Sequence, residues 1–319
     1  MARVRGTPLA RETVNAPAPP RVSVIVPAYR AEDTIAEALA SVAAQTFRDL
    51  EAIVVDDHSP DDTWRAAQAA LPGAVALRLP ENRGPAAARN AGLERARGEW
   101  IAFLDGDDAW LPWRLQTQIE ALARHPEALM LCGGVVLFGE NAGKRPRSED
   151  LPSRERRVAL EEFVEGNPVP TSTVLARAET LRRVGGFDER FRGPEDIDLW
   201  MRVAAAGEVV KLEVPLVRYR ERPGSLCMDQ DRFLPQIEAV YAKAFAPDGV
   251  LYPFRRWRRR ALAGRCVSAA WSYAACGRRG RALRLLLRSW RLWPGRLKVE
   301  QRRPEWRLLL LGKILLNRT

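Results

Sequence analysis

Short apolar runs alternate with longer amphipathic stretches along the first part of the chain. The runs are rich in valine, isoleucine and leucine, as is typical of buried strands, and they span residues 22–26, 50–55, 75–79 and 100–104. The stretches between them repeat apolar residues with helical spacing and predict helices at residues 34–45, from 59, at 86–96 and at 112–124. This alternation with short connections predicts an α/β fold, a Rossmann-like, mostly parallel sheet flanked by helices on both faces.

Helix-start signals support these boundaries. Thr34 is followed three residues later by Glu37, the spacing of a capping box in which the side chain at each position binds the backbone N–H of the other. Pro85 stands where the third helix begins, a position that needs no N–H donor. We therefore expect Thr34 to cap the first helix.

The second half of the chain has a less regular pattern. Residues 139–157 are polar and charged, so we expect a mobile surface loop there. The remaining segments predict strands at 129–138, 174–176, 209–214 and 216–219, a short helix at 178–184, a helix from 195 with an apolar stripe, and helices throughout from about Phe233.

The charge of the protein is concentrated near its C-terminus. The 319 residues carry a formal net charge of +11 and are 46% hydrophobic, which suits a globular core. Residues 255–319 hold 19 basic and 2 acidic residues, so this segment has a net charge of +17 and the rest of the chain −6. We predict a disordered leader at 1–20, a catalytic domain at 21–230 and a basic helical C-terminal region at 231–319.

Several classes of protein are disfavoured by composition. The four cysteines are widely spaced without a C-x-x-C pair, which fits neither a zinc site nor a disulfide framework and suggests thiols in a reducing cytoplasm. The two histidines cannot supply a histidine-based metal site. Residues 1–20 lack the apolar segment of a signal peptide, and no apolar run has the length of a membrane span.

The strongest chemical signal is a group of carboxylates at the end of the fourth predicted strand. Asp105, Asp107 and Asp108 occupy four consecutive positions with Gly106. Like charges that close repel one another, and a hard divalent cation bound by their oxygens would relieve the repulsion. The alternative is an aspartate-rich turn whose carboxylates are solvated.

Other polar residues follow neighbouring strands directly. Asp56 and Asp57 end the second predicted strand, and Pro27 ends the first. Ligands of such sheets bind outside the carboxyl ends of the strands. The sequence therefore predicts that these groups and the Asp105 cluster share one edge of the sheet.

Five segments, taken together and in order, resemble a family 2 glycosyltransferase. They are Val22–Tyr29, Val54–Ser59, Asn82–Gly92, Leu104–Asp108 and Glu195–Trp200. The resemblance spans about residues 20–225 and implies a GT-A fold. It implies an inverting enzyme that moves one sugar from a nucleoside-diphosphate donor to an acceptor hydroxyl. No G-x-G-x-x-G follows the first strand, which separates the chain from dinucleotide-binding dehydrogenases.

The resemblance also implies roles for residues on the donor side. Pro27, Ala28 and Tyr29 match the segment that lines the nucleotide base, and Asp57 matches the carboxylate that holds the base or ribose. The remaining matches are Arg89 and Asn90, on a helix facing the donor, and Gly106 within the D-x-D motif. The alternatives are a strand-ending turn for residues 27–29, a helix-capping role for Asp57 and a solvated helix face for the pair at 89 and 90.

Metal and acid–base roles follow from the same match. Asp105 and Asp107 match the carboxylates that bind a divalent cation, Mn²⁺ or Mg²⁺, on the donor diphosphate. Asp196 matches the catalytic base and Glu195 the residue that orients it or contacts the acceptor. The alternative for these two acids is that they complement a helix dipole. One departure from the family is His58, where a glycine is common.

Three interpretations of the basic C-terminal segment remain open. Basic amphipathic helices with tryptophan bind anionic membrane surfaces, so residues 255–319 could contact the inner face of the plasma membrane, which suits a lipid-linked acceptor. They could instead form a helical hairpin that packs on the catalytic domain with solvated arginines. Nucleic-acid binding is the third, and we expect no nucleic acid because no recognition motif accompanies the charge.

These observations lead to one functional hypothesis and one alternative. We predict a cytoplasmic, peripherally membrane-associated, metal-dependent glycosyltransferase that acts in cell-wall, exopolysaccharide or lipid-linked glycan synthesis. The alternative is a non-catalytic nucleotide-sugar-binding or scaffold protein tethered through its basic tail. The intact set Asp105, Asp107 and Asp196 favours the enzyme.

Overall fold

The computed structural model describes residues 18–139, 154–221, 229–297 and 306–316. The strands are β1 (Val22–Ala28), β2 (Leu50–Asp56), β3 (Val75–Arg78), β4 (Trp100–Phe103), β5 (Ala109–Trp110), β6 (Met130–Gly139), β7 (Glu155–Arg157), β8 (Leu175–Arg177) and β9 (Val209–Glu221). The α-helices are α1 (Ile35–Ala43), α2 (Thr63–Ala70), α3 (Pro85–Arg95), α4 (Arg114–Arg124), α5 (Ala178–Arg183), α6 (Glu195–Ala206), α7 (Gln230–Ala244), α8 (Arg258–Ala275), α9 (Arg279–Leu292) and α11 (Trp306–Leu316). Short 3₁₀ helices are η2 (Leu160–Val164), η3 (Thr171–Thr173) and η5 (Tyr252–Trp257). The predicted leader and most of the predicted loop at 139–157 lie outside the described residues.

The strands form one sheet in the order β3-β2-β1-β4-β8-β6-β9-β5, with β7 paired to β9. The first four strands of this order are parallel, as predicted. Strand β8 is antiparallel to both of its neighbours, whereas β6 and β9 are parallel to each other. The α/β prediction is confirmed, and the parallel half places the carboxyl ends of β1, β2 and β4 at a common edge.

The sheet is covered on both faces because side chains alternate along its strands. In β1, Ile25 belongs to a core that also contains residues of α3, α6 and α7, whereas Val24 and Val26 belong to a core that contains residues of α1 and α4. In β4, Phe103 belongs to the first of these cores and Trp100 to the second. Two apolar cores therefore hold the sheet between helical layers, and they fix the edge formed by the carboxyl ends of β1, β2 and β4 from both faces.

One sequence expectation about the strands is wrong. Residues 209–214 and 216–219 do not form two strands around Pro215 but one, β9. The register with β6 shifts at Gly133 and Gly134, opposite this proline. Proline within a sheet is accommodated at such irregularities, and a Cβ at Gly133 would stand 2.3 Å from the Leu216 side chain.

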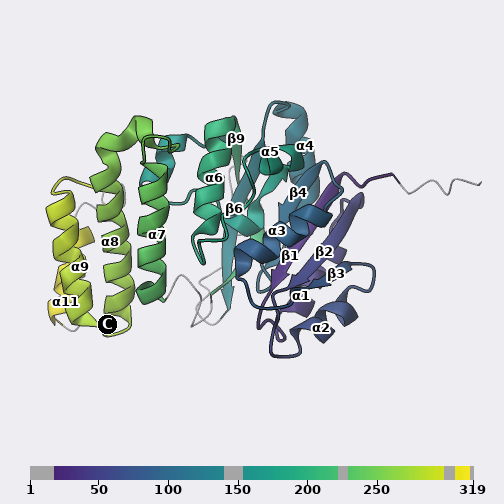
Figure 1. The fold of residues 1–319 in the computed structure, drawn as a ribbon, viewed down its shortest axis with the longest axis horizontal. Helices are drawn as coiled ribbons and strands as arrows, with labels where there is room; N and C mark the ends of the chain where they lie inside the picture. Colours follow the sequence, from purple (N-terminus) through teal and green to yellow (C-terminus); the bar gives the residue numbers. More distant parts are fainter. Residues whose placement is uncertain (1–17, 140–153, 222–228, 298–305, 317–319) are drawn as a thin grey trace, which may run out of the picture.

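The C-terminal helices stand beside the sheet domain. Figure 1 shows the sheet on the right, α8, α9 and α11 on the left, and α6 and α7 between them. Helix α7 places Ile237 and Tyr241 in the same core as Trp200 of α6. A third apolar core begins with Ala263 of α8 and joins α8 to α9 and α11. The predicted division at residue 231 stays a prediction, and the change of core falls within α8.

The helical spacing of the sequence predicts a basic stripe on α9, formed by Arg281, Arg284, Arg288 and Arg291. The contacts of these four arginines differ. Arg281 is ion-paired with Asp231, and Arg288 bonds Glu238 at 2.7 Å. Each of these two pairs joins α9 to α7 at positions seven residues apart, which is two helical turns. Among the described residues, no helix has both the length and the apolar content to cross a membrane.

Candidate active site

The ends of β1 and β4 meet at the predicted edge. The Ala28 carbonyl accepts a 2.9 Å bond from Asp57 N–H, which joins the ends of β1 and β2. Gly106 lies against β1 so closely that a Cβ there would stand 3.2 Å from the Pro27 carbonyl oxygen. The small residue in the D-x-D motif therefore permits the close approach of two chain segments.

Thr34 fastens this loop instead of capping its helix. Its hydroxyl makes no capping bond to the start of α1. It donates to the Gly106 carbonyl at 2.8 Å and, more weakly, to the Ala31 carbonyl at 3.4 Å. The capping-box prediction is wrong because a tertiary acceptor, 72 residues away, binds the hydroxyl.

Arg89 joins two motifs that are far apart in the sequence. Its guanidinium donates from Nη2 to Asp105 Oδ1 and from Nη1 to Glu195 Oε1, both at 2.6 Å. Burial alone would lower the pKa of Arg89, but the carboxylates of Asp105 and Glu195 raise it. The arginine is therefore always charged, and it holds the start of α6 beside the D-x-D loop.

Asp196 lies next to this pair at the start of α6. Its Oδ2 accepts from Thr171 Oγ1 at 2.8 Å and from the Asn167 amide at 3.2 Å. Burial, and then the neighbouring charge of Glu195, raises the pKa of Asp196 to about 7. A carboxylate with such a pKa can accept a proton at neutral pH.

Glu195 binds groups of the protein through its carboxylate. Its side chain is buried, with Oε1 bound to Arg89 and Oε2 accepting from Gly193 N–H at 2.6 Å. Both oxygens are used within the protein.

Asp108 is the buried member of the acidic cluster. It accepts from Ser172 Oγ at 2.6 Å and from Arg220 N–H at 2.9 Å. Burial and the charges of Asp105 and Asp107 raise the pKa of Asp108 well above its usual range. Arg220 also donates from Nε to the Asp107 carbonyl at 2.8 Å, so β9 and η3 hold the loop from behind.

Asp57 organises the loop that precedes α3. Its carboxylate accepts from Arg83 N–H and Gly84 N–H, both at 2.8 Å, and from the Asn82 amide at 2.9 Å. Burial raises the pKa of Asp57, and the two backbone bonds oppose that rise. The structure thus joins Asp57 to the Asn82–Gly84 segment of the sequence motif.

Two predicted donor residues have different surroundings. The Asn90 amide exchanges bonds of 2.9 Å with the backbone of Phe187, so it fixes a turn before α6. The Tyr29 side chain is 43% exposed at the end of β1. The Tyr29 ring is therefore accessible to a nucleotide base, whereas the Asn90 amide is hydrogen-bonded to the protein backbone.

Backbone strain also gathers at this edge. Arg30 and His58 have positive φ values of 50° and 57°. Such values are uncommon for residues with a side chain and often occur at functional sites. The conformation of His58 gives a physical reason for the glycine that is common at its position in the resembled family.

The acidic residues fit a cation that shares its ligands with a substrate. Among the described residues, no three acidic, histidine or cysteine side chains converge to hold a metal ion by themselves. Mg²⁺-type ions are usually bound by one or two carboxylates together with substrate phosphates. Asp105 is 30% exposed despite its bond to Arg89, and Asp105 and Asp107 are the pair that the sequence predicts for such an ion.

Comparison with known proteins identifies the family. The sequence profile described as Glycosyl transferase family 2 matches residues 23–181. EpsE of Bacillus subtilis is 34% identical over 209 residues, which cover 63% of this chain and 73% of EpsE. The chain belongs to glycosyltransferase family 2. The succinoglycan biosynthesis protein ExoO of Rhizobium meliloti is 31% identical over 256 residues, 76% of this glycosyltransferase and 73% of ExoO.

Solved structures confirm the GT-A fold of this glycosyltransferase. Staphylococcus aureus TarS matches with a TM-score of 0.60 and 20% identity over 93% of this chain, which spans only 53% of that TarS chain. TarS residues 1–349 in complex with UDP-GlcNAc match with a TM-score of 0.60 and 19% identity, over 86% of this chain and 89% of that TarS chain. The mannosyltransferase PcManGT of Pyrobaculum calidifontis, in complex with GDP-Man and Mn²⁺, matches with a TM-score of 0.59 and 21% identity. The match covers 94% of this chain and 88% of PcManGT.

The structure brings four residues to the site that the sequence motifs did not assign. Asn167 and Thr171 bind Asp196, whereas Ser172 and Arg220 bind Asp108. They come from an irregular segment and from the end of β9, where neither periodicity nor motif gives a signal. The hydroxyl-rich run Thr171–Thr173 was the only pointer in the sequence.

Proposed function

We propose that this glycosyltransferase is an inverting enzyme that transfers one sugar from a nucleoside-diphosphate donor to an acceptor hydroxyl. The observation that supports it best is Arg89, which joins the D-x-D carboxylate Asp105 to Glu195, the neighbour of Asp196. This contact links a donor-side group to the residue that directly precedes the candidate base. Single displacement needs both groups on opposite sides of the same sugar carbon.

Asp196 takes the proton in this mechanism. The acceptor oxygen attacks the anomeric carbon as Asp196 removes its hydrogen, and the bond from that carbon to the diphosphate oxygen breaks. Thr171 and Asn167 hold one carboxylate oxygen of Asp196. Glu195 is assigned the positioning role instead, because its Oε1 is ion-paired with the buried Arg89, whereas the oxygens of Asp196 accept from neutral donors.

Asp105 and Asp107 would hold a divalent cation on the diphosphate, and such an ion stabilises charge on the leaving group. The Mn²⁺ in the PcManGT complex supports this assignment by analogy of fold. Pro27, Ala28 and Tyr29 would line the base, with Asp57 fixing the loop behind it. The UDP-GlcNAc and GDP-Man complexes of fold relatives leave the nucleotide open.

The acceptor is proposed to be a growing cell-surface polysaccharide or a lipid-linked glycan. ExoO, a relative at 31% identity, is named for succinoglycan biosynthesis. Arg284 and Arg291 of α9 are exposed, which supports contact with an anionic membrane surface. We propose peripheral attachment through residues 255–319 at the inner face of the membrane.

A donor screen tests the reaction class. The purified protein is incubated with UDP-, GDP- and dTDP-sugars in the presence of Mn²⁺, Mg²⁺ or a chelator, and release of nucleoside diphosphate is measured. We expect one donor to be hydrolysed or bound in a metal-dependent way. If a folded protein responds to none of them, the enzymatic proposal fails and a non-catalytic binding role replaces it.

A further inference from the structure

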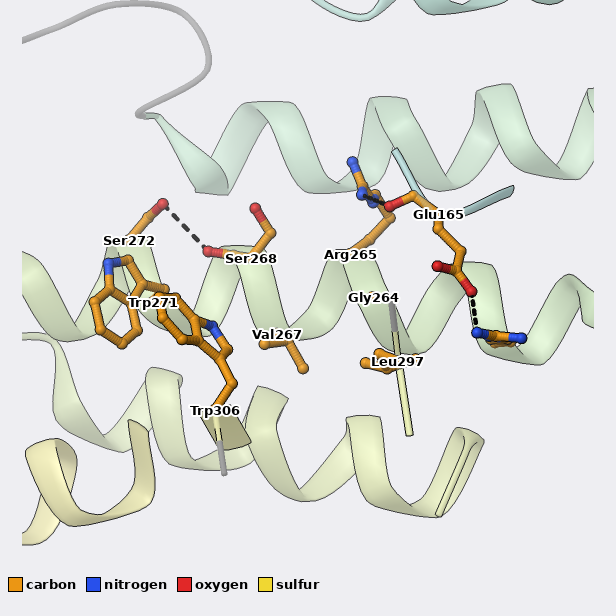
Figure 2. Close-up of a pocket in the computed structure, with 10 residues that line it drawn as sticks. Glu165, Gly264, Arg265, Val267, Ser268, Trp271, Ser272, Leu297 and Trp306 are labelled. Carbon is orange, nitrogen blue, oxygen red and sulfur yellow. Dashed lines mark hydrogen bonds and ion pairs between the residues drawn. The ribbon is translucent and has the colours of Figure 1, made fainter. Parts of the chain in front are cut away.

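A cavity of about 330 Å³ lies away from the carboxylate cluster, in the C-terminal helical region. Its volume is within the range of about 300–1,000 Å³ that is usual for small-molecule sites. Figure 2 shows two indole rings at one end, Glu165 at the other and Arg265 between them. The lining residues are Glu165, Arg260, Gly264, Arg265, Val267, Ser268, Trp271, Ser272, Leu297 and Trp306.

The aromatic end presents a flat apolar surface. The rings of Trp271 and Trp306 are stacked, with centroids 4.8 Å apart and planes at 19°. Both side chains are half-buried. The hydroxyl-bearing residues Ser268 and Ser272 stand beside them on α8. A ligand at this end therefore meets an apolar platform with polar groups at its rim.

The polar end has hydrogen-bonding capacity that the protein does not use. Glu165 is ion-paired with Arg260 through Oε1, and its backbone carbonyl accepts from Arg265 at 2.8 Å. Glu165 Oε2 and the Nε atoms of both arginines are buried without a hydrogen-bond partner. Such orphan groups are rare in folded proteins and costly, so a ligand that offers hydroxyl groups would satisfy them.

Gly264 keeps the cavity open. It lies within α8, where glycine is unfavourable by about 0.5–1 kcal/mol relative to alanine. A Cβ at this position would meet no atom within 4 Å. Helix packing therefore does not require glycine here, and the missing side chain leaves space in the wall of the cavity.

We propose that this cavity is a second saccharide site, which binds a sugar ring of the acceptor glycan away from the reacting hydroxyl. A sugar ring combines a C–H face, which suits the stacked indoles, with hydroxyl groups, which suit Glu165 and the arginines. The inference rests on the proposed function because it takes the acceptor to be a glycan.

The chain connects this cavity to the transfer site. Glu165 lines the cavity, and Asn167, two residues later, donates to the Asp196 carboxylate. Two residues of extended chain span at most about 7 Å. An acceptor sugar in the cavity is thus recognised by the same short segment that holds the base.

The test is oligosaccharide binding in the absence of donor. The full chain is screened on a printed array of oligosaccharides from bacterial polysaccharides, and the strongest binder is titrated by calorimetry into the wild type and variants. Gly264→Leu fills the cavity with a residue that favours the helix, so loss of binding cannot come from a weakened α8. Glu165→Gln removes the charge of the polar end.

The expected result is binding about tenfold or more weaker in Gly264→Leu, as overpacking of a site predicts, and a loss in Glu165→Gln. Gly280→Leu is the matched control on α9, where a Cβ also meets nothing within 4 Å, and it should bind like the wild type. Unchanged binding in Gly264→Leu would overturn the proposal. So would a wild-type protein that binds no oligosaccharide on the array but binds inorganic phosphate in calorimetry.

Donor hydrolysis separates this inference from the proposed function. Gly264→Leu should hydrolyse the donor at the wild-type rate, since Gly264 is outside the transfer site. Donor turnover without saccharide binding in the wild type refutes the second site alone. Saccharide binding at the cavity without turnover of any donor refutes the transfer reaction and leaves a binding protein.

Discussion

At the residue scale, Asp196 combines a raised pKa with partners that fix its direction. Its Oδ2 is held by Thr171 and Asn167. The neighbouring Glu195 is paired with Arg89, and its charge still contributes to the raised pKa of Asp196. Motif matching could locate Asp196 because the acidic helix start is local in sequence. It could not locate Thr171 or Asn167, because their contact with Asp196 depends on how the irregular segment 165–173 crosses the sheet edge.

Replacement of Asp196 by asparagine tests its assignment as the base. The amide keeps the shape of the side chain but cannot take a proton, so we expect transfer to fall by about 10²–10⁴-fold. Donor affinity should stay within about twofold, because the substitution leaves Asp105 and Arg89 in place. Rates come from nucleoside-diphosphate release with acceptor, and affinity from calorimetry.

The exposed Asp62, ahead of α2, supplies the matched control. Asp62→Asn should behave like the wild type in both measurements. Wild-type transfer by Asp196→Asn would remove Asp196 from the mechanism.

The pKa of Asp196 also predicts a pH profile. Burial and the charge of Glu195 raise this pKa to about 7, so the group is protonated and inactive as a base below pH 7. The transfer rate should rise with pH through about 7 and level off above it. A profile measured at saturating donor that stays flat between pH 5.5 and about 8 would contradict the assignment.

At the element scale, the D-x-D loop is held by side chains from three other elements. Thr34 before α1, Ser172 of η3 and Arg220 of β9 all bind residues of this loop or its end. The loop itself was predictable, since acidic residues after an apolar strand give a strong local pattern. The side chains that support the loop were not predictable. The spacing of Thr34 and Glu37 predicts a capping box, but the Thr34 hydroxyl binds the distant Gly106 carbonyl instead.

Thr34→Val tests this support. Valine has nearly the same shape but cannot donate, so the buried Gly106 carbonyl loses a partner at a cost of about 1–3 kcal/mol. We expect the KM for the donor to rise several-fold and the free energy of unfolding to fall. Thr34→Ser, which keeps the hydroxyl, should restore both values, and a Thr34→Val variant with wild-type KM would show that the bond does not position the loop.

At the scale of the whole molecule, the C-terminal helices use part of their charge internally. Arg281 and Arg288 meet Asp231 and Glu238 across α7 and α9. The sequence predicted the arginine stripe, but not which arginines are paired, because the register between two helices depends on the core of α8. Arg284 and Arg291, also on the predicted stripe, are exposed.

Membrane attachment should depend on the exposed arginines. A triple variant with Arg279, Arg284 and Arg291 changed to glutamine should lose binding to phosphatidylserine vesicles, since each basic residue near an anionic surface contributes about 1 kcal/mol. Vesicle co-sedimentation measures the effect. The control changes Arg65, Arg95 and Arg154, exposed arginines of the sheet domain, and equal binding by both variants would refute attachment through the C-terminal region.

The shared arginine has a consequence for the order of events. Arg89 donates one hydrogen bond to each of two carboxylates, Asp105 and Glu195. A donor that draws Asp105 toward itself therefore changes the surroundings of Glu195. Because Asp196 is the next residue, its surroundings also change before the acceptor arrives. We expect a compulsory-order kinetic pattern with the donor first. A dead-end acceptor analogue without the reacting hydroxyl should then inhibit uncompetitively against the donor, because it binds only after the donor. Noncompetitive inhibition would indicate two independent half-sites instead of one coupled unit.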